Sequence, residues 1–164
     1  GICNGFQALV KSGLLPYGNF EDANSTSPTL FYNDANQHVA KMVETRIANT
    51  NSPWLAGVQV GDIHAIPVSH GEGKFVVTAE EFAVLRDNGQ IFSQYVDFDG
   101  KPSMDSKYNP NGSVNAIEGI TSKNGQIIGK MGHSERYEDG LFQNIPGNKD
   151  QHLFASAVKY FTGK

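Results

Sequence analysis

The only cysteine of the chain stands near its start, between two glycines, in Gly1-Ile2-Cys3-Asn4-Gly5. This G-x-C-x-G spacing is typical of a nucleophile on a tight turn between a strand and a helix. The backbone of such a turn is strained, and neighbours two residues away must lack a Cβ atom. The turn exposes the side chain, while the amide of Asn4 and the start of the next helix face any oxyanion that forms. The alternative is a small buried cysteine beside a loop.

Composition excludes several classes of protein. The net charge is −4, which argues against a nucleic-acid surface or a basic membrane-binding face. No run approaches the roughly 18 apolar residues of a membrane span, and the first residues lack a signal-peptide pattern. A single cysteine excludes an internal disulfide framework and a multi-cysteine zinc site, and it fits the reducing cytoplasm. The 164 residues are enough for one domain, which we take to span 1–164.

The apolar pattern predicts an α/β sheet with antiparallel additions. Helical spacing predicts one helix between Cys3 and Gly13, a second from the capping residue Thr78 to Gly89, and a third over 150–161. Pro67 indicates that its strand lies at a sheet edge or ends there. Strands are predicted over 29–32, 39–47, 62–69, 75–77, 90–97, 117–122 and 126–131, with a hairpin turn at Asn124-Gly125 between the last two.

The position of the cysteine is unusual for this kind of turn. A buried strand is expected before it, yet Cys3 is the third residue, and the chain does not begin with methionine. We therefore expect the chain to be a piece of a longer protein, with strands that precede the turn missing.

A cysteine nucleophile needs a base, and His133 is the best placed of the five histidines. It follows the end of a predicted strand, where open α/β sheets carry their sites. Glu135 could accept a hydrogen bond from the imidazole of His133 and fix its tautomer, which would complete a nucleophile, a base and an orienting carboxylate. The alternative is that His133 and Glu135 are polar loop residues without a catalytic role.

A second histidine–glutamate pair, His70 and Glu72, lies in H-G-E-G. Glycines on both sides of Glu72 indicate that another group approaches the backbone closely. Together with His133 and Glu135, this pair could supply metal ligands, although neither pair has helical H-x-x-x-H spacing, and we expect no metal site. The glycine-rich phosphate-binding motifs of nucleotide-binding proteins are missing from the sequence.

Four motifs occur together in a recognisable order: G-I-C-N-G-F-Q, V-S-H-G-E-G-K-F, N-P-N-G-S-V-N-A-I-E-G-I and G-H-S-E-R. Through these motifs the sequence resembles the glutamine amidotransferase domain of phosphoribosylformylglycinamidine synthase. The resemblance extends over almost the whole chain. The resemblance implies part of a Cys-His-Glu amidotransferase fold, with a mostly parallel sheet flanked by helices and antiparallel hairpin additions. It also implies glutamine hydrolysis that supplies ammonia for purine biosynthesis.

The resemblance implies a role for each matching residue. Cys3 would attack the side-chain amide of glutamine, His133 would act as base and acid, and Glu135 would orient His133. One departure is Ser134, since much of the family has proline at this position. Serine keeps the spacing between His133 and Glu135, so we expect activity to survive, with a less rigid turn.

The resemblance also implies contacts with the substrate. Gln7 would line the pocket for glutamine, and Asn4 would supply one oxyanion amide. His70, Gly71 and Glu72 would lie in a loop beside the glutamine site.

The partners implied are L-glutamine and a synthetase domain or subunit, where ATP and Mg²⁺ would act; no cofactor is expected in this chain, nor any nucleic-acid or membrane partner. Two alternatives remain open. The chain could be another cysteine-nucleophile amide hydrolase on a related fold. It could also be catalytically silent when isolated, because the family's second oxyanion amide comes from a segment that this chain lacks.

Overall fold

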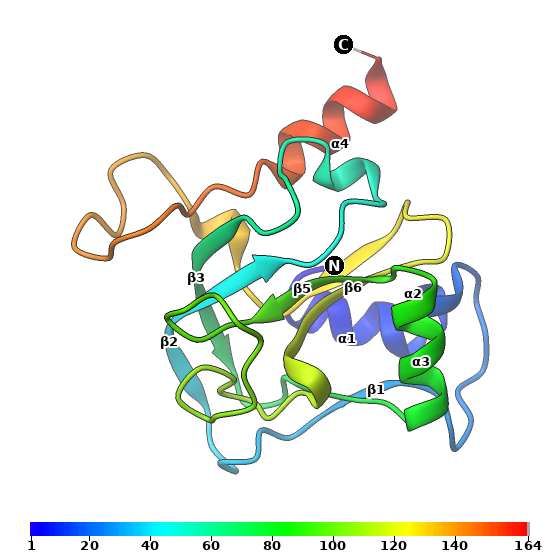
Figure 1. The fold of residues 1–164 in the computed structure, drawn as a ribbon. Helices are drawn as coiled ribbons and strands as arrows, with labels where there is room; N and C mark the ends of the chain where they lie inside the picture. The colour runs from blue at the N-terminus through cyan, green and yellow to red at the C-terminus, as the bar shows by residue number, and fades with distance from the viewer. Residues whose placement is uncertain (164) are drawn as a thin grey trace.

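The computed structural model describes residues 1–163 (Figure 1). It is an α/β fold, and the predicted helices and strands are present with small shifts at their ends. The helices are α1 (Asn4–Lys11), α2 (Leu14–Tyr17), α3 (Ala79–Asp87) and α4 (Leu153–Thr162). The strands are β1 (Thr29–Phe31), β2 (Val39–Ile47), β3 (Ile63–His70), β4 (Lys74–Val76), β5 (Ile91–Tyr95), β6 (Ile117–Thr121) and β7 (Ile128–Lys130).

The expectation of a mostly parallel sheet is wrong for the strands of this chain. The main sheet has the order β3-β2-β5-β6-β7, and every neighbouring pair in it is antiparallel. Parallel neighbours need a crossover connection, usually a helix. No helix here makes that crossover: α1 precedes every strand, α3 joins β4 to β5, which belong to different sheets, and α4 follows β7.

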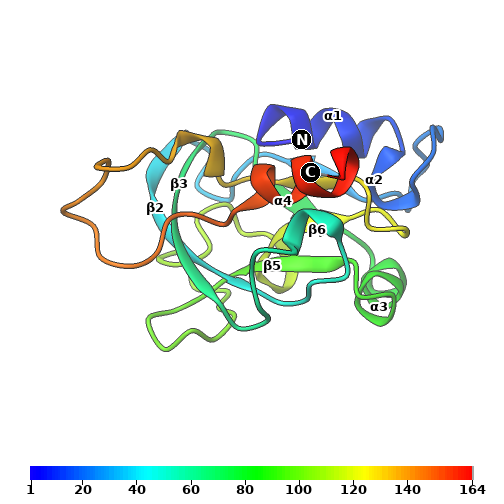
Figure 2. The same ribbon diagram turned by 90° about the horizontal axis from the view of Figure 1, so that it is seen from above.

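Parallel pairing is confined, among residues 1–163, to two isolated bridges. Ile2 pairs with Lys130, and His64 pairs with Asn148. The first bridge places the backbone just before the cysteine along the free edge of β7. The second joins β3 to the loop 137–150. This loop projects from the molecule and returns to β3 at Asn148 (Figures 1 and 2).

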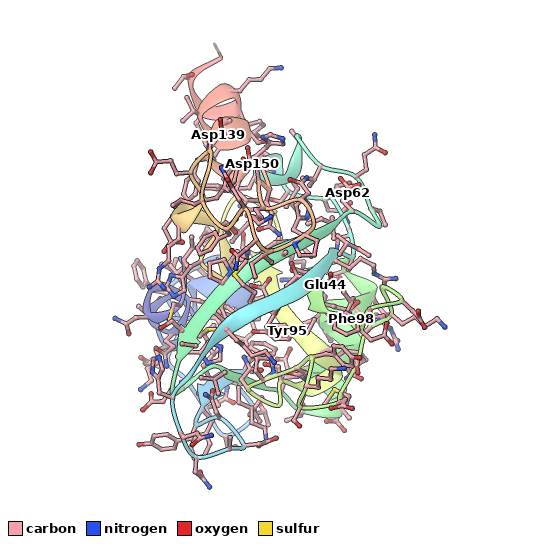
Figure 3. The ribbon with its side chains drawn as sticks, turned by 90° about the vertical axis from the view of Figure 1, so that its left-hand side faces the viewer. Glu44, Asp62, Tyr95, Phe98, Asp139 and Asp150 are labelled. Atoms are coloured by element: carbon pink, nitrogen blue, oxygen red, sulfur yellow. The ribbon has the colours of Figure 1, made fainter. Side chains whose placement is uncertain are left out.

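Strand β3 forms the opposite edge of the sheet, as Pro67 predicts. Pro67 pairs with Met42 of β2. A proline fits an edge strand because no neighbouring strand needs its missing N–H. Figure 3 views the molecule from the side of β2 and β3, whose long strands cross that face.

Local signals define several boundaries. The Thr78 hydroxyl accepts a hydrogen bond from the Glu81 amide at 3.2 Å, as the capping box predicts at the start of α3. The predicted turn at Asn124-Gly125 joins β6 to β7, and the Asn124 side-chain oxygen accepts from the Gln126 amide at 3.1 Å.

The first helix is fixed to the sheet by the main apolar core. Phe6 and Val10 of α1 are buried in a cluster that also contains Phe75 and Ile120, and the rings of Phe6 and Phe75 stack with their centroids 6.0 Å apart. Burial of several such side chains contributes roughly 1.5–3 kcal/mol each. Helix α1 is therefore a firm base for the turn that precedes it.

The last helix, α4, is only partly buried against the rest of the molecule. Leu153 and Ala157 of α4 are buried, whereas Phe154, Val158 and Phe161 are at least half exposed. Figures 1 and 2 show α4 beside the short turn Pro53–Leu55 and away from α3. Within residues 1–163, no helix has the length and apolar character needed to cross a bilayer.

Candidate active site

Cys3 lies on a strained turn immediately before α1. Its backbone angles are φ 52° and ψ −111°, a left-handed φ that non-glycine residues rarely adopt. The Cys3 amide donates to the carbonyl oxygen of Lys130 at 2.8 Å, and the Gly5 amide donates to that of Ile2 at 2.9 Å. The tight turn predicted from the glycine spacing is confirmed.

The two glycines of the motif differ in what they contact. A Cβ atom added to Gly1 would lie 2.5 Å from the Gly5 carbonyl oxygen, so this position requires glycine. A Cβ atom added to Gly5 would have no atom within 4 Å among the residues that the structure describes. The prediction that both neighbours must lack a Cβ atom is therefore wrong for Gly5, whose side faces open space.

The Cys3 sulfur contacts the backbone of β3. Its thiol donates to the carbonyl oxygen of Ser69 across 3.7 Å. Partial burial raises the pKa of the Cys3 thiol; the Asn4 amide and the Arg136 charge oppose this rise, and the Glu135 charge adds to it. Burial therefore favours the neutral thiol, which needs a base to take its proton before it can attack.

His133 follows β7 and precedes a single helical turn, Ser134–Arg136. Its Nδ1 lies 2.6 Å from Glu135 Oε1, the contact predicted for a base and its orienting carboxylate. Because an ionised carboxylate only accepts hydrogen bonds, Nδ1 carries the proton. The other ring nitrogen, Nε2, is buried and has no hydrogen-bond partner among residues 1–163. The free basic nitrogen is therefore Nε2.

The outer edge of β3 brings Cys3 and His133 together. The His133 amide donates to the carbonyl oxygen of Pro67 at 2.8 Å, and the Cys3 thiol donates to that of Ser69. Residues two apart on a strand present their carbonyl groups to the same side, about 7 Å apart. The thiol and the histidine are thus held at neighbouring positions on one strand edge, although the sequence separates them by most of the chain.

The predicted loop after β3 is anchored by a residue that the sequence did not single out, Asn33. Its amide nitrogen donates to the His70 carbonyl oxygen at 2.8 Å, and its Oδ1 accepts from the Gly73 amide at 3.1 Å. The same Oδ1 lies 3.1 Å from His70 Nδ1, which must therefore be the protonated nitrogen. Burial lowers the pKa of His70 to about 4, so this imidazole is neutral near pH 7.

The glycines around Glu72 also differ. A Cβ atom on Gly73 would lie 2.7 Å from the His70 ring, so the close approach predicted here is made by His70 itself. A Cβ atom on Gly71 would meet nothing within 4 Å in the described chain.

Gln7 and Glu72 meet at a surface cavity beside α1. The Gln7 amide donates to the Glu72 carbonyl oxygen at 3.0 Å and to its carboxylate at 3.3 Å. The cavity of about 330 Å³ is lined in part by Asn4, Gln7 and Glu72. The structure thus brings together three of the residues expected to contact substrate, from two motifs far apart in the sequence.

The asparagine-rich motif before β6 (residues 109–115) is hydrogen-bonded to β4, the strand that follows the His70 loop. The Ser113 hydroxyl accepts from the Phe75 amide at 2.9 Å and donates to Asn111 at 2.8 Å. Asn111 in turn donates to the buried Tyr95 hydroxyl at 2.9 Å. The motif was visible in the sequence, but its role was not, because Phe75 lies 38 residues from Ser113 and Tyr95 lies 16 residues from Asn111.

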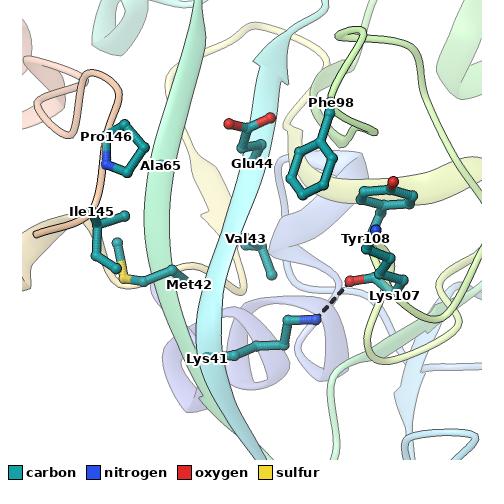
Figure 4. A pocket seen from close by; sticks show the side chains of 10 residues that line it. All are labelled: Lys41, Met42, Val43, Glu44, Ala65, Phe98, Lys107, Tyr108, Ile145 and Pro146. Atoms are coloured by element: carbon teal, nitrogen blue, oxygen red, sulfur yellow. Dashed lines mark hydrogen bonds between the residues drawn. The ribbon is translucent and has the colours of Figure 1, made fainter.

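Two further regions do not join the candidate site. Within residues 1–163, no three His, Cys, Asp or Glu side chains are grouped to hold a metal ion, so His70, Glu72, His133 and Glu135 do not form such a group. A cavity of about 270 Å³ lies over β2, between Met42 and Pro146 on one side and Phe98 on the other (Figure 4). Figure 3 shows Glu44 and Phe98, which line it, on this same side of the molecule.

Comparisons with known proteins identify relatives of this chain. The family model of the CobB/CobQ-like glutamine amidotransferase domain matches residues 1–161. Phosphoribosylformylglycinamidine synthase subunit PurQ of Thermomicrobium roseum is 40% identical over 158 residues, which are 96% of this chain and 60% of that protein. The PurQ of Acaryochloris marina is 38% identical over 154 residues, 88% of this chain and 60% of that protein.

A solved structure has the same fold. A chain in the structure of PurLQS from Thermotoga maritima superimposes with a TM-score of 0.69 at 25% identity, over 98% of this chain and 60% of that one. The chain thus spans about 60% of the length of these relatives. Because the family model covers nearly every residue, the chain belongs to the CobB/CobQ-like glutamine amidotransferase domain family.

Proposed function

We propose that this chain carries the glutamine-hydrolysing site of a phosphoribosylformylglycinamidine synthase. The ammonia released would be used in the ATP-dependent conversion of formylglycinamide ribonucleotide to formylglycinamidine ribonucleotide. Family membership and the names of the PurQ relatives support this assignment. The observation that carries it is the strained Cys3 turn beside His133, whose Nδ1 is held by Glu135 and whose Nε2 is left free.

The first half of the reaction forms a thioester. The Cys3 proton passes to His133 Nε2 as the sulfur bonds to the carboxamide carbon of glutamine, and Glu135 stabilises the imidazolium that results. The amide of Asn4 faces the oxyanion at the start of α1. When the carbon–nitrogen bond breaks, His133 returns the proton to the departing nitrogen, and ammonia leaves a glutamyl thioester on Cys3.

The second half regenerates the thiol. Water attacks the thioester carbon as His133 Nε2 takes one of its protons. The carbon–sulfur bond breaks, His133 protonates the sulfur, and glutamate departs. The proton balance closes over the two halves, so no other reactant is needed at this chain.

The cavity beside α1 is suited to hold the glutamine substrate. Gln7 and Glu72 line it, and when their mutual hydrogen bond is exchanged for substrate, the Glu72 carboxylate matches the amino end of a free amino acid and the Gln7 amide its carboxylate end. Asn4, which lines this cavity, directly follows Cys3 in the chain. The neighbouring His70 and Gly71 complete the loop on that side.

The partner in this proposal is a synthetase domain or subunit, where ATP and Mg²⁺ act on the ribonucleotide. The similar solved chain comes from a structure named PurLQS, and this name is consistent with a PurQ chain that assembles with other subunits. The single free cysteine is consistent with function in the cytoplasm.

The proposal is tested by assaying the complete protein that contains this chain, with its synthetase partner, against a panel of amides. We expect release of ammonia from glutamine at a kcat/KM at least about tenfold above that for asparagine and simple amides, since the site is built around one substrate. Equal or better turnover of another amide would instead identify a different cysteine hydrolase. The absence of ammonia release from every amide would reject the enzymatic assignment.

A further inference from the structure

A buried ion pair lies behind the turn that carries His133. Lys130 Nζ is 3.6 Å from Glu118 Oε1, and both side chains are fully buried. No step of the proposed reaction uses either charge. Removal of two charges from water costs free energy that their attraction repays only in part, so such a pair is weak support for stability alone.

The pair contacts the residues on both sides of His133. Glu118 Oε1 accepts a hydrogen bond from the Gly132 amide at 2.7 Å. Lys130 Nζ donates to the Ser134 hydroxyl at 2.7 Å. The Gly132 backbone and the Ser134 side chain, on either side of His133, are therefore tied to the same buried ion pair.

The backbone of Lys130 also holds the cysteine turn. Its carbonyl oxygen accepts the Cys3 amide at 2.8 Å, and Ile2 pairs with Lys130 in a parallel bridge. One residue thus contacts both halves of the candidate site: its main chain fixes the position of Cys3, and its side chain reaches the His133 turn.

The hydrogen-bond network around this ion pair leaves some buried polar atoms without a partner among residues 1–163. Gln151 Oε1 accepts from Lys130 Nζ and from the Ser134 hydroxyl, both at 2.6 Å. However, Glu118 Oε2 and Gln151 Nε2 are buried with no partner among residues 1–163. Unsatisfied buried polar atoms cost stability, so the arrangement is better explained by what it positions than by a net gain in folding free energy.

We infer that Lys130, paired with Glu118, is a positioning residue that sets the separation between Cys3 and the His133 imidazole. This inference rests on the proposed function, and it names an element of that site outside the three residues that react. Ser134 is the contact through which the lysine holds the turn.

The test compares two ways of removing the contact. Lys130→Met alone would leave the Glu118 carboxylate buried and unpaired, so the lysine is removed in the double variant Lys130→Met, Glu118→Gln. Ser134→Ala removes only the hydroxyl, and Ser134→Thr retains it. Val43→Ala, in a separate part of the core, is the control for loss of stability.

The readouts separate positioning from folding. In the complete protein, we expect the double variant and Ser134→Ala to lower kcat for glutamine at least about tenfold, because small displacements of a catalytic group are costly. We expect KM to change less than about twofold, since substrate binding is not touched. Ser134→Thr should restore the wild-type kcat, and Val43→Ala should lower the melting temperature while leaving kcat unchanged.

A second readout does not depend on glutamine turnover. In proton NMR spectra, the His133 Nδ1 proton bonded to Glu135 should resonate far downfield in the wild type and in Ser134→Thr, and should be lost or shifted in the double variant. Retention of both this resonance and kcat in the double variant and in Ser134→Ala would overturn the inference, as would a kcat that falls only in parallel with stability. If the wild type itself fails to hydrolyse glutamine, the proposed function fails, and the resonance alone decides whether Lys130 positions the turn.

Discussion

The Cys3 thiol donates to the backbone carbonyl oxygen of Ser69 across 3.7 Å. This contact fixes the candidate nucleophile to the outer edge of β3, the same edge whose Pro67 carbonyl oxygen accepts the His133 amide. An edge strand has carbonyl groups that no neighbouring strand uses. Here those groups hold the thiol of Cys3 and the backbone of His133, residues that are far apart in the sequence.

The first prediction concerns the protonation of Cys3. Because burial raises the pKa of its thiol, alkylation by iodoacetamide should accelerate with pH to a midpoint above the value of about 8.5 for a free cysteine. Arg136→Gln removes a charge that lowers this pKa, so the midpoint should move further upward. Glu138→Gln, an exposed carboxylate outside the charges that act on Cys3, is the matched control. A wild-type midpoint below about 7 would show a stabilised thiolate and contradict this account.

The second prediction concerns the carboxylate that holds His133. Glu135→Gln replaces the acceptor at Nδ1 with an amide that can donate, which favours the wrong imidazole tautomer. We expect kcat for glutamine to fall at least about 10²-fold, with the stability changed by less than about 0.5 kcal/mol because the side chain is partly exposed. Steady-state kinetics and urea denaturation measure the two effects. A kcat within twofold of the wild type would remove Glu135 from the site.

The third prediction concerns Gly5. Since a Cβ atom there meets only open space, Gly5→Ala should fold normally and gain about 0.5–1 kcal/mol from the lower helix propensity of glycine. Urea denaturation of the complete protein measures the gain. If the open space holds substrate, KM for glutamine should rise in the same variant. Destabilisation by more than 1 kcal/mol would show that this glycine is required by the fold after all.

The sequence predicted the parts of this structure that depend on neighbouring residues. The strained turn at Cys3, the capping residue Thr78 and the hairpin turn at Asn124-Gly125 are local, and all three are confirmed. The mostly parallel pairing that we predicted is wrong for these strands. Whether neighbouring strands run parallel depends on whether a crossover, usually a helix, connects them. The periodicity of a single strand carries no information on that point.

The supporting residues of the site were harder to predict. Asn33 acts through backbone groups near His70, about 40 positions away, and asparagine in a loop is ordinarily exposed. Lys130 ends a short strand, and nothing in the sequence distinguishes a buried lysine from a solvated one. Their roles become visible only when the chain is folded.

The fourth prediction concerns pH and His70. Burial holds the pKa of His70 at about 4 in the folded chain, below the unfolded value of about 6.5. The unfolded chain therefore binds more protons between these values, so stability is fully present above pH 6.5 and is lost as the pH falls toward 4. The loss from this group is about 3 kcal/mol.

The test of this prediction is the variant His70→Asn, which keeps a polar group beside Asn33. Its free energy of unfolding should fall less steeply than that of the wild type between pH 6.5 and pH 4.5. Burial also lowers the pKa of His64, so this residue makes the free energy of unfolding fall with decreasing pH in both proteins alike. Parallel curves for the two proteins would show that His70 is not the group responsible.

The central claim is that Cys3 attacks glutamine, and covalent labelling tests it most directly. The complete protein is incubated with a glutamine-analogue alkylating agent, with and without excess glutamine, and the adduct is located by peptide mass spectrometry. We predict a single adduct on Cys3 that excess glutamine prevents, no adduct in Cys3→Ser, and a fall in glutamine hydrolysis of at least about 10³-fold in that variant. An adduct on another residue, or a Cys3→Ser variant that still hydrolyses glutamine, would contradict the account.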